Sequence, residues 1–270
     1  MDRRLSARLI AVIAAPIFAP SVAAQNPVPA QPAVEQVSAV TPASTGEGSL
    51  PTTKEVLDKF EKASGGHEVL ANLTTRYMKG IYQTEDGSGF AAIEIFSKAP
   101  NKAYFKISLP NGLVMREVCD GKSAWMEDVS GRFHEFTGAA LESRIRHANF
   151  NDQAQGILMA LTGHVVGTEK VGVHTTYVVE FSPDKKTTSR AYFDTESGFP
   201  VRADEVMHRE DGDYKVETYM DDYRMVEGTY FPYRLRHVEK GNVFTVRITQ
   251  IKNNAPVDDA LFLKPQVARK

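Results

Sequence analysis

The sequence predicts a mainly β protein in which a few helices cover the concave face of one curled antiparallel sheet, an incomplete barrel. Three observations support this class. Apolar and polar residues alternate with the period of a strand along most of residues 74–136 and 165–251. Turn residues such as Gly, Asn, Asp and Pro separate the alternating segments. Segments with helical periodicity precede the first block and separate the two blocks. A sheet of about eleven strands is expected to curl, because neighbouring strands twist by roughly 20°.

The first helix is expected to start after Thr52 or Thr53 and to stop at the two glycines that follow residue 64. Either threonine can cap the helix, and Glu55 places a negative charge in its first turn. A stripe of apolar residues at helical spacing consists of Val56, Leu57, Phe60 and Ala63. This stripe needs a surface to pack against, and a face of the sheet is the surface available.

The strands are expected to follow one another as an antiparallel meander with short turns. The clearest hairpin covers residues 186–202, in which residues 194–198 make the turn. The first block of strands is expected at residues 75–84, 90–97, 102–109, 113–119, 122–128 and 132–136. The second block is expected at residues 165–171, 175–181, 187–194, 201–209, 213–223, 229–240 and 242–251. A short turn around Leu261 and Phe262 closes the chain.

Two helices are expected between the blocks, over residues 137–147 and 151–161. Their apolar positions, which we expect to face the sheet as a lid, include Leu141, Ile145, Ile157 and Leu158. Arg144, Arg146 and His147 alternate with them. These three form either the solvated face of an amphipathic helix or the charged outer side of a mobile lid.

Several strands are apolar on one side, and these sides are expected to form one concave face. The residues expected to line a ligand there are Phe105, Ile107, Val179, Phe181, Phe193, Val201, Tyr233 and Leu235. If the helices fill the hollow, these residues are simply core. If the helices leave room, the hollow takes an acyl chain, whose burial contributes about 0.8 kcal/mol for each methylene. The pattern leaves both cases open.

The first 24 residues have the features of a secretory signal peptide. Arginines form a basic start, and the apolar stretch at residues 9–19 is too short to span a bilayer, which takes about 20 residues. Cleavage is expected after Ala24, and no cysteine lies near that site to carry a lipid anchor. Residues 25–49, rich in Pro, Ala and Ser, are expected to be a disordered linker, and residues 50–265 a single domain.

Composition and motif searches exclude several classes of function. The 32 basic and 34 acidic residues show no basic block, which argues against nucleic acid as a partner. Cys119 is the only cysteine, so a disulfide within the chain is impossible, and a small buried side chain is the simpler interpretation. The seven histidines lack metal-ligand spacing. No catalytic triad, dyad or cofactor motif is found, so neither an enzyme nor a cofactor is expected. Trp125 is interpreted as a core anchor rather than a ligand-stacking residue.

Three segments carry a resemblance to a known family. Residues 192–202 (YFDTESGFPVR) are similar to the strand, turn and strand of periplasmic lipoprotein carriers of the LolA/LolB type. Residues 223–232 (YRMVEGTYFP) and 251–262 (IKNNAPVDDALF) resemble later segments of related outer membrane lipoprotein-sorting proteins. The resemblance spans residues 50–265. It implies a half-barrel with a hydrophobic cavity under a helical lid that binds acylated or lipidic ligands without chemistry.

The expected function is therefore that of a periplasmic, non-enzymatic carrier or binding protein. Its ligand would be a lipid or the acyl chain of a lipoprotein, and a membrane-associated donor or acceptor protein would be a further partner. The alternative is a structural or sensory module whose hollow is filled by its own helices and which acts through a protein partner.

Overall fold

A computed structural model describes residues 49–87, 89–150, 163–182, 188–209 and 212–264. Its strands form one antiparallel sheet. They are β1 (Thr75–Thr84), β2 (Phe90–Lys98), β3 (Lys102–Ser108), β4 (Val114–Cys119), β5 (Ala124–Glu127), β6 (Phe133–Glu135), β7 (His164–Val171), β8 (His174–Phe181), β9 (Ser189–Asp194), β10 (Pro200–Arg209), β11 (Gly212–Val226), β12 (Thr229–Glu239) and β13 (Asn242–Asn253). The helices are α2 (Thr53–Ala63), α3 (His67–Ala71), α4 (Gly138–His147) and the 3₁₀ helix η2 (Asp259–Phe262).

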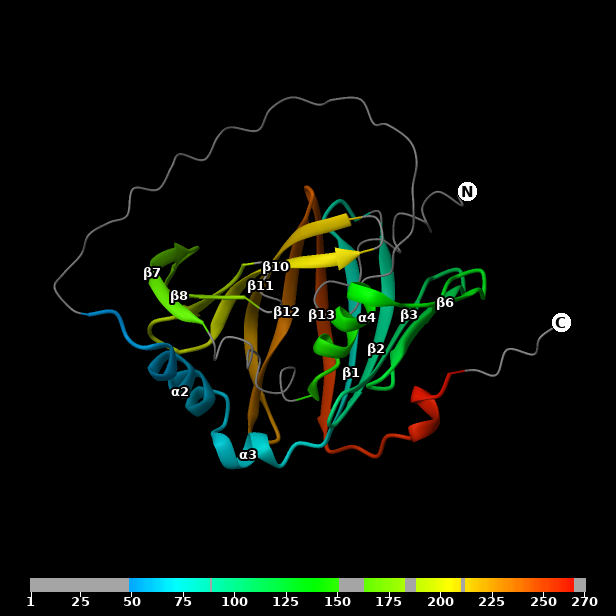
Figure 1. Ribbon diagram of the computed structural model, residues 1–270, viewed down its shortest axis with the longest axis horizontal. Coiled ribbons are helices and arrows are strands. Elements are labelled where there is room, and N and C mark those ends of the chain that lie inside the picture. The colour runs from blue at the N-terminus through cyan, green and yellow to red at the C-terminus, as the bar shows by residue number, and fades with distance from the viewer. Residues whose placement is uncertain (1–48, 88, 151–162, 183–187, 210–211, 265–270) are drawn as a thin grey trace, which may run out of the picture.

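The order of the strands differs from a single meander. The 13-stranded sheet runs β6-β5-β4-β3-β2-β1-β13-β12-β11-β10-β9-β8-β7. The two blocks are thus two meanders joined where β1 pairs antiparallel with β13, from Arg76 opposite Asn253 to Thr84 opposite Phe244. The edges of the sheet are β6 and β7, which Figure 1 shows on opposite sides of the molecule. The sheet is curled and unclosed, as the sequence predicts.

Helix α2 starts as predicted and lies across one end of the strands (Figure 1). Thr52 and Glu55 form a capping box, in which each side chain binds the backbone N–H of the other residue. The end of α2 is tied to the β11–β12 turn, where the Tyr230 N–H donates to the Ser64 carbonyl at 3.2 Å. Among the described residues, no helix is long and apolar enough to cross a membrane.

The strands carry apolar side chains on both faces. The concave face holds the largest apolar cluster, which spans β1–β5 and β11–β13 and packs against α4. On the convex face, Trp125 packs with Tyr104, Val118 and Phe262 of η2. Trp125 is therefore a core residue, as predicted, but it anchors the C-terminal segment to the outside of the sheet. Helices α2 and α4 pack against the concave face.

Candidate functional site

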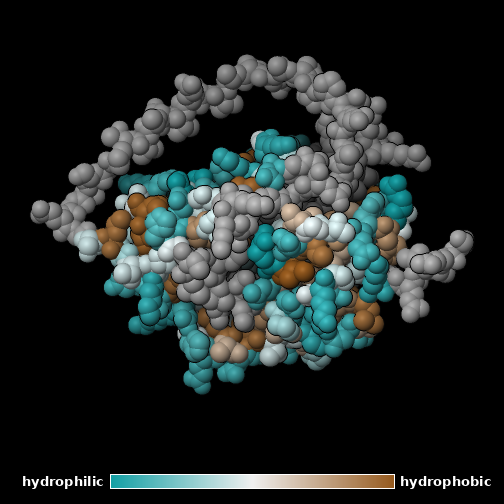
Figure 2. All heavy atoms as spheres, in the orientation of Figure 1, coloured by the Kyte–Doolittle hydropathy of each residue, from teal (hydrophilic) through white to brown (hydrophobic). Residues whose placement is uncertain are grey.

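The floor of the concave face is formed by predicted lining residues. Phe105 and Ile107 of β3 are buried in the large cluster. Tyr233 and Leu235 of β12 belong to the same cluster but are only partly buried, and so are Leu141 and Ile145 of α4. Figure 2 shows hydrophobic side chains at the surface near α4, among hydrophilic ones. The structure therefore brings the predicted strand and helix positions together. Ile157 and Leu158 lie outside the described residues.

A second apolar region lies beneath α2. Val179, Phe181 and Phe193 of β8 and β9 pack against the predicted stripe of the helix. The rings of Phe60 and Phe193 lie 5.9 Å apart. The concave face thus has two apolar regions, one covered by α4 and the other by α2.

Val201 does not join Phe193 on the concave face, which corrects the prediction that both line one wall. Val201 packs with Val178 and Tyr192 in a separate cluster. Pro200, and not Val201, lies opposite Phe193 in the β9–β10 pairing. Residues directly opposite each other share a face and successive side chains alternate, so Val201 points to the other face.

Helix α4 is fastened to one half of the sheet by a buried ion pair. Arg144 Nε lies 3.0 Å from Glu117 Oε1 of β4, and both side chains are at most 5% exposed. The guanidinium also stacks on the Phe136 ring, 3.5 Å from its centre. The prediction that Arg144 belongs to a solvated or outward face is therefore wrong. A charged residue between the apolar positions of a helix is normally expected to be exposed. The sequence does not show its buried partner, because Glu117 lies 27 residues earlier.

The same helix approaches the other half of the sheet through His147. Its Nδ1 donates to the Ser143 carbonyl at 2.7 Å, and its Nε2 lies 3.9 Å from Glu205 Oε2 of β10. In the strand order, β4 and β10 lie far apart on opposite sides of the β1–β13 junction. Helix α4 therefore spans the hollow between the two halves of the curled sheet.

Polar groups that the sequence analysis did not single out lie in the floor of the hollow. His237 is buried, stacks on the Phe244 ring at 4.7 Å and shares a 3.0 Å hydrogen bond with Thr218. Burial away from water lowers the pKa of His237 to about 3. The Tyr82 hydroxyl is also buried, and burial raises its pKa. Both groups are therefore neutral at physiological pH and can act as hydrogen-bonding groups without charge.

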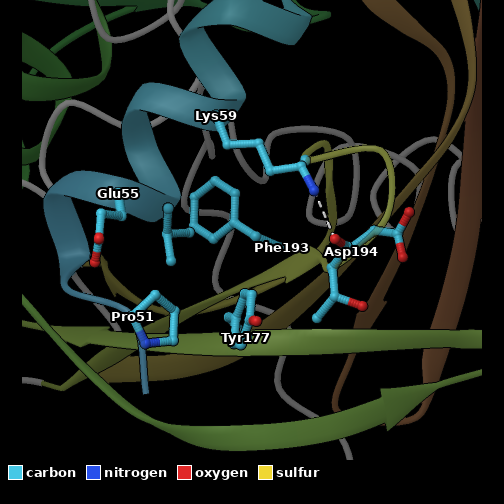
Figure 3. A pocket seen from close by; sticks show the side chains of 9 residues that line it. Pro51, Glu55, Lys59, Tyr177, Phe193 and Asp194 are labelled. Carbon is cyan, nitrogen blue, oxygen red and sulfur yellow. Dashed lines mark hydrogen bonds between the residues drawn. The ribbon is translucent and has the colours of Figure 1, made fainter. Parts of the chain in front are cut away.

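A pocket opens between α2 and the β8–β9 region. Its volume is about 260 Å³. Figure 3 shows Lys59 reaching from α2 toward the turn after β9, above Phe193 and Tyr177. The pocket is lined by Pro51, Glu55, Val56, Lys59, Tyr177, Phe193, Asp194, Thr195 and Gly198. It is mostly apolar, with charged groups on its walls.

The acidic, histidine and cysteine side chains bear on metal binding and on thiol chemistry. Among the described residues, no cluster of three or more His, Cys, Asp or Glu could hold a metal ion. Cys119 is buried, and burial raises the pKa of its thiol to about 11. The thiol is therefore protonated at neutral pH and behaves as a small apolar side chain. The geometry suits the binding of an apolar ligand.

The curled, unclosed sheet with helices on its concave face is a LolA-like fold. No protein-family model matches the sequence, and no curated protein matches it. A LolA superfamily protein from Nitrosomonas europaea superposes with a TM-score of 0.53 at 13% identity, covering 80% of this chain and 99% of that chain. A DUF1329 family protein from Desulfovibrio piger also gives 0.53 at 13% identity, covering 78% and 97%. At these identities the likeness establishes the fold.

Proposed function

We propose that this protein is a periplasmic, non-enzymatic carrier that holds a lipid or the acyl chain of a lipoprotein on its concave face. The observation that supports this most is a set of partly buried apolar residues on β12 and α4. Tyr233 and Leu235 pack against the same buried apolar cluster as Leu141 and Ile145. An acyl chain that enters between them gains about 0.8 kcal/mol for each methylene it buries.

The attachment of α4 supports its role as the cover of this lining. The helix is joined to β4 through Arg144 and approaches β10 through His147. Arg144 and His147 make these contacts, and the proposed lining residues Leu141 and Ile145 on the same helix are only partly buried. A ligand would displace the apolar side chains of the helix while the ion pair keeps the helix over the hollow.

The proposed location follows from the N-terminal sequence and from the fold. We propose export through the predicted signal peptide with cleavage after Ala24, and no lipid anchor, because the only cysteine is Cys119. N-terminal sequencing of the exported protein is expected to begin at Gln25. A start at Met1 in the periplasmic fraction would contradict this proposal. A donor or acceptor at a membrane would complete the transfer.

The direct test is native mass spectrometry of the protein purified from its periplasm, before and after extraction with organic solvent. A lipid adduct that extraction removes is expected, together with displacement by that lipid of a bound fluorescent long-chain fatty-acid probe. Leu235→Asp places a charge in the lining and should weaken probe binding at least tenfold. Arg247→Asp, on the exposed face of the neighbouring strand, is the control and should leave binding unchanged. A clean apo mass with no probe binding would overturn the carrier function.

A second candidate function has its own observation. Strand β7 is an edge of the sheet, and Val166 within it and Val173 in the turn after it are exposed. An exposed edge can accept a strand from a protein partner. In that case the helices fill the hollow and the protein is a structural or sensory module. Charged substitutions at Val166 would then abolish its function in the cell, whereas Leu235→Asp would act only through stability.

A further inference from the structure

The pocket beneath α2 combines apolar walls with a basic side chain. Pro51, Val56, Tyr177 and Phe193 supply the apolar part (Figure 3). The exposed Lys59 closes the solvent side, where its Nζ donates to the Thr195 carbonyl at 2.6 Å. Within the described residues, the Thr195 carbonyl is the one hydrogen-bond partner of the Lys59 ammonium. An ammonium has three donors, so two are left for a ligand.

The turn after β9 holds the Lys59 side chain in place. A Cβ atom added to Gly198 would lie 2.9 Å from Lys59 Cγ and 3.3 Å from the Lys59 carbonyl oxygen. Gly198 also has a φ of +81°, which a residue with a side chain rarely adopts. The glycine therefore lets the turn pass directly against the lysine stem. The stem lies against the turn and the ammonium donates to the Thr195 carbonyl, so the charge lies at the pocket wall.

The two carboxylates that line the pocket are already engaged elsewhere. Glu55 accepts hydrogen bonds from the Thr52 N–H at 2.7 Å and the Thr52 hydroxyl at 2.9 Å. Asp194 accepts from the Ser197 N–H at 3.0 Å and the Ser197 hydroxyl at 2.6 Å, and His174 lies 3.5 Å away. Neither forms an ion pair with Lys59 among the described residues, so the positive charge of Lys59 is not neutralised within the pocket.

We infer that the α2 pocket binds a medium-chain fatty acid, with its carboxylate on Lys59 and its hydrocarbon chain between Val56, Tyr177 and Phe193. The pocket has a volume of about 260 Å³ and is partly open to solvent, so it suits a short hydrocarbon chain rather than a long one. Octanoate is therefore the probe. The inference rests on the proposed function, since both place an apolar ligand on the concave face.

The test compares octanoate with octanol, which has the same chain and no charge, by calorimetric titration of the full chain. Lys59→Met keeps the apolar stem and removes the charge. It is expected to weaken octanoate binding at least tenfold and octanol binding less than twofold. Lys59→Arg should restore most of the octanoate affinity. Glu55→Gln, which can keep the capping box, should raise octanoate affinity about twofold, because it removes a like charge from the wall.

Two results would overturn the inference. One is unchanged octanoate binding by Lys59→Met. The other is an equal loss of octanoate and octanol affinity with a lower melting temperature, because Lys59 would then merely anchor α2 to the turn. The proposed carrier function is tested apart from this. Leu235→Asp should lose the long-chain probe yet keep octanoate. If Lys59→Met refutes the inference, the long-chain result still stands. If the long-chain probe does not bind, octanoate binding can still be measured on its own.

Discussion

At the scale of single residues, His237 shows how the floor of the hollow excludes charge. Its ring lies 4.7 Å from the Phe244 ring and bonds Thr218, in a position that is 1% exposed. Protonation there would place a cation in a buried position against an aromatic ring. Burial therefore lowers the pKa of His237 to about 3, against an ordinary value of 6.5. The native protein keeps this histidine neutral.

This pKa shift makes stability depend on pH in a definite direction. The unfolded chain binds a proton at His237 near pH 6.5, whereas the native chain does so near pH 3. Stability is therefore full above pH 6.5 and falls by about 1.4 kcal/mol for each pH unit below about 6. Urea unfolding of wild type and His237→Gln between pH 7.5 and 4.5 measures this. The free energy of unfolding of His237→Gln should therefore fall less steeply with decreasing pH than that of the wild type.

His164→Gln is the matched control, because His164 is exposed at the start of β7. Its slope should equal that of the wild type. Parallel curves for wild type and His237→Gln would mean that the buried histidine titrates normally.

Single residues also mark the limit of what the sequence predicts. Phe105 and Ile107 were placed on the concave face correctly, because alternation along a regular strand determines the face. Val201 was misplaced because Pro200, rather than Val201, pairs with Phe193, and alternation within one strand does not fix the register between two strands. Arg144 was misplaced because it is buried against Glu117, which lies in strand β4 and not in the helix. Local periodicity carries no information about such distant partners.

At the scale of elements, the attachment of α4 depends on a buried ion pair. Glu117→Ala would leave the buried Arg144 guanidinium without this carboxylate and should cost about 3–5 kcal/mol of unfolding free energy. Adding Arg144→Leu should recover much of this loss, since an apolar replacement removes the stranded charge. Urea denaturation of the single and double variants measures the coupling. Lys54→Ala breaks the exposed Lys54–Asp58 pair and should leave the urea midpoint almost unchanged, because solvent screens this pair. Equal losses at the exposed and buried pairs would contradict the argument.

The docking of α2 gives a second prediction at this scale. A Cβ at Gly65 would lie 2.3 Å from the Gly228 carbonyl oxygen, in the β11–β12 turn. A Cβ at Gly66 would meet nothing within 4 Å, although both glycines have positive φ. Gly65→Ala should therefore cost about 1–3 kcal/mol more than Gly66→Ala. Thermal unfolding of both variants checks this, and equal costs would show that the backbone conformation alone matters.

At the scale of the whole molecule, the sheet joins two meanders that the sequence describes separately. Hairpins could be predicted because each turn is local in sequence. The junction could not, because β1 and β13 pair residues such as Arg76 and Asn253. Their alternating patterns would permit many partners. This junction makes one continuous concave face, so a ligand bound against β12 contacts a sheet that contains both halves of the domain.

A ligand on this face should therefore stabilise the protein as a whole. A ligand that binds only the native state adds about 2.7 kcal/mol when present at 100 times its dissociation constant. For a domain of this size, that corresponds to a rise of about 5–11 °C in melting temperature. Differential scanning calorimetry with a long-chain fatty acid should show one transition that moves upward. Leu235→Asp, whose charge lies in the lining beside α4, should melt at the same temperature with and without the acid. A wild-type transition that stays in place at saturating acid would mean that the concave face is filled by the protein itself.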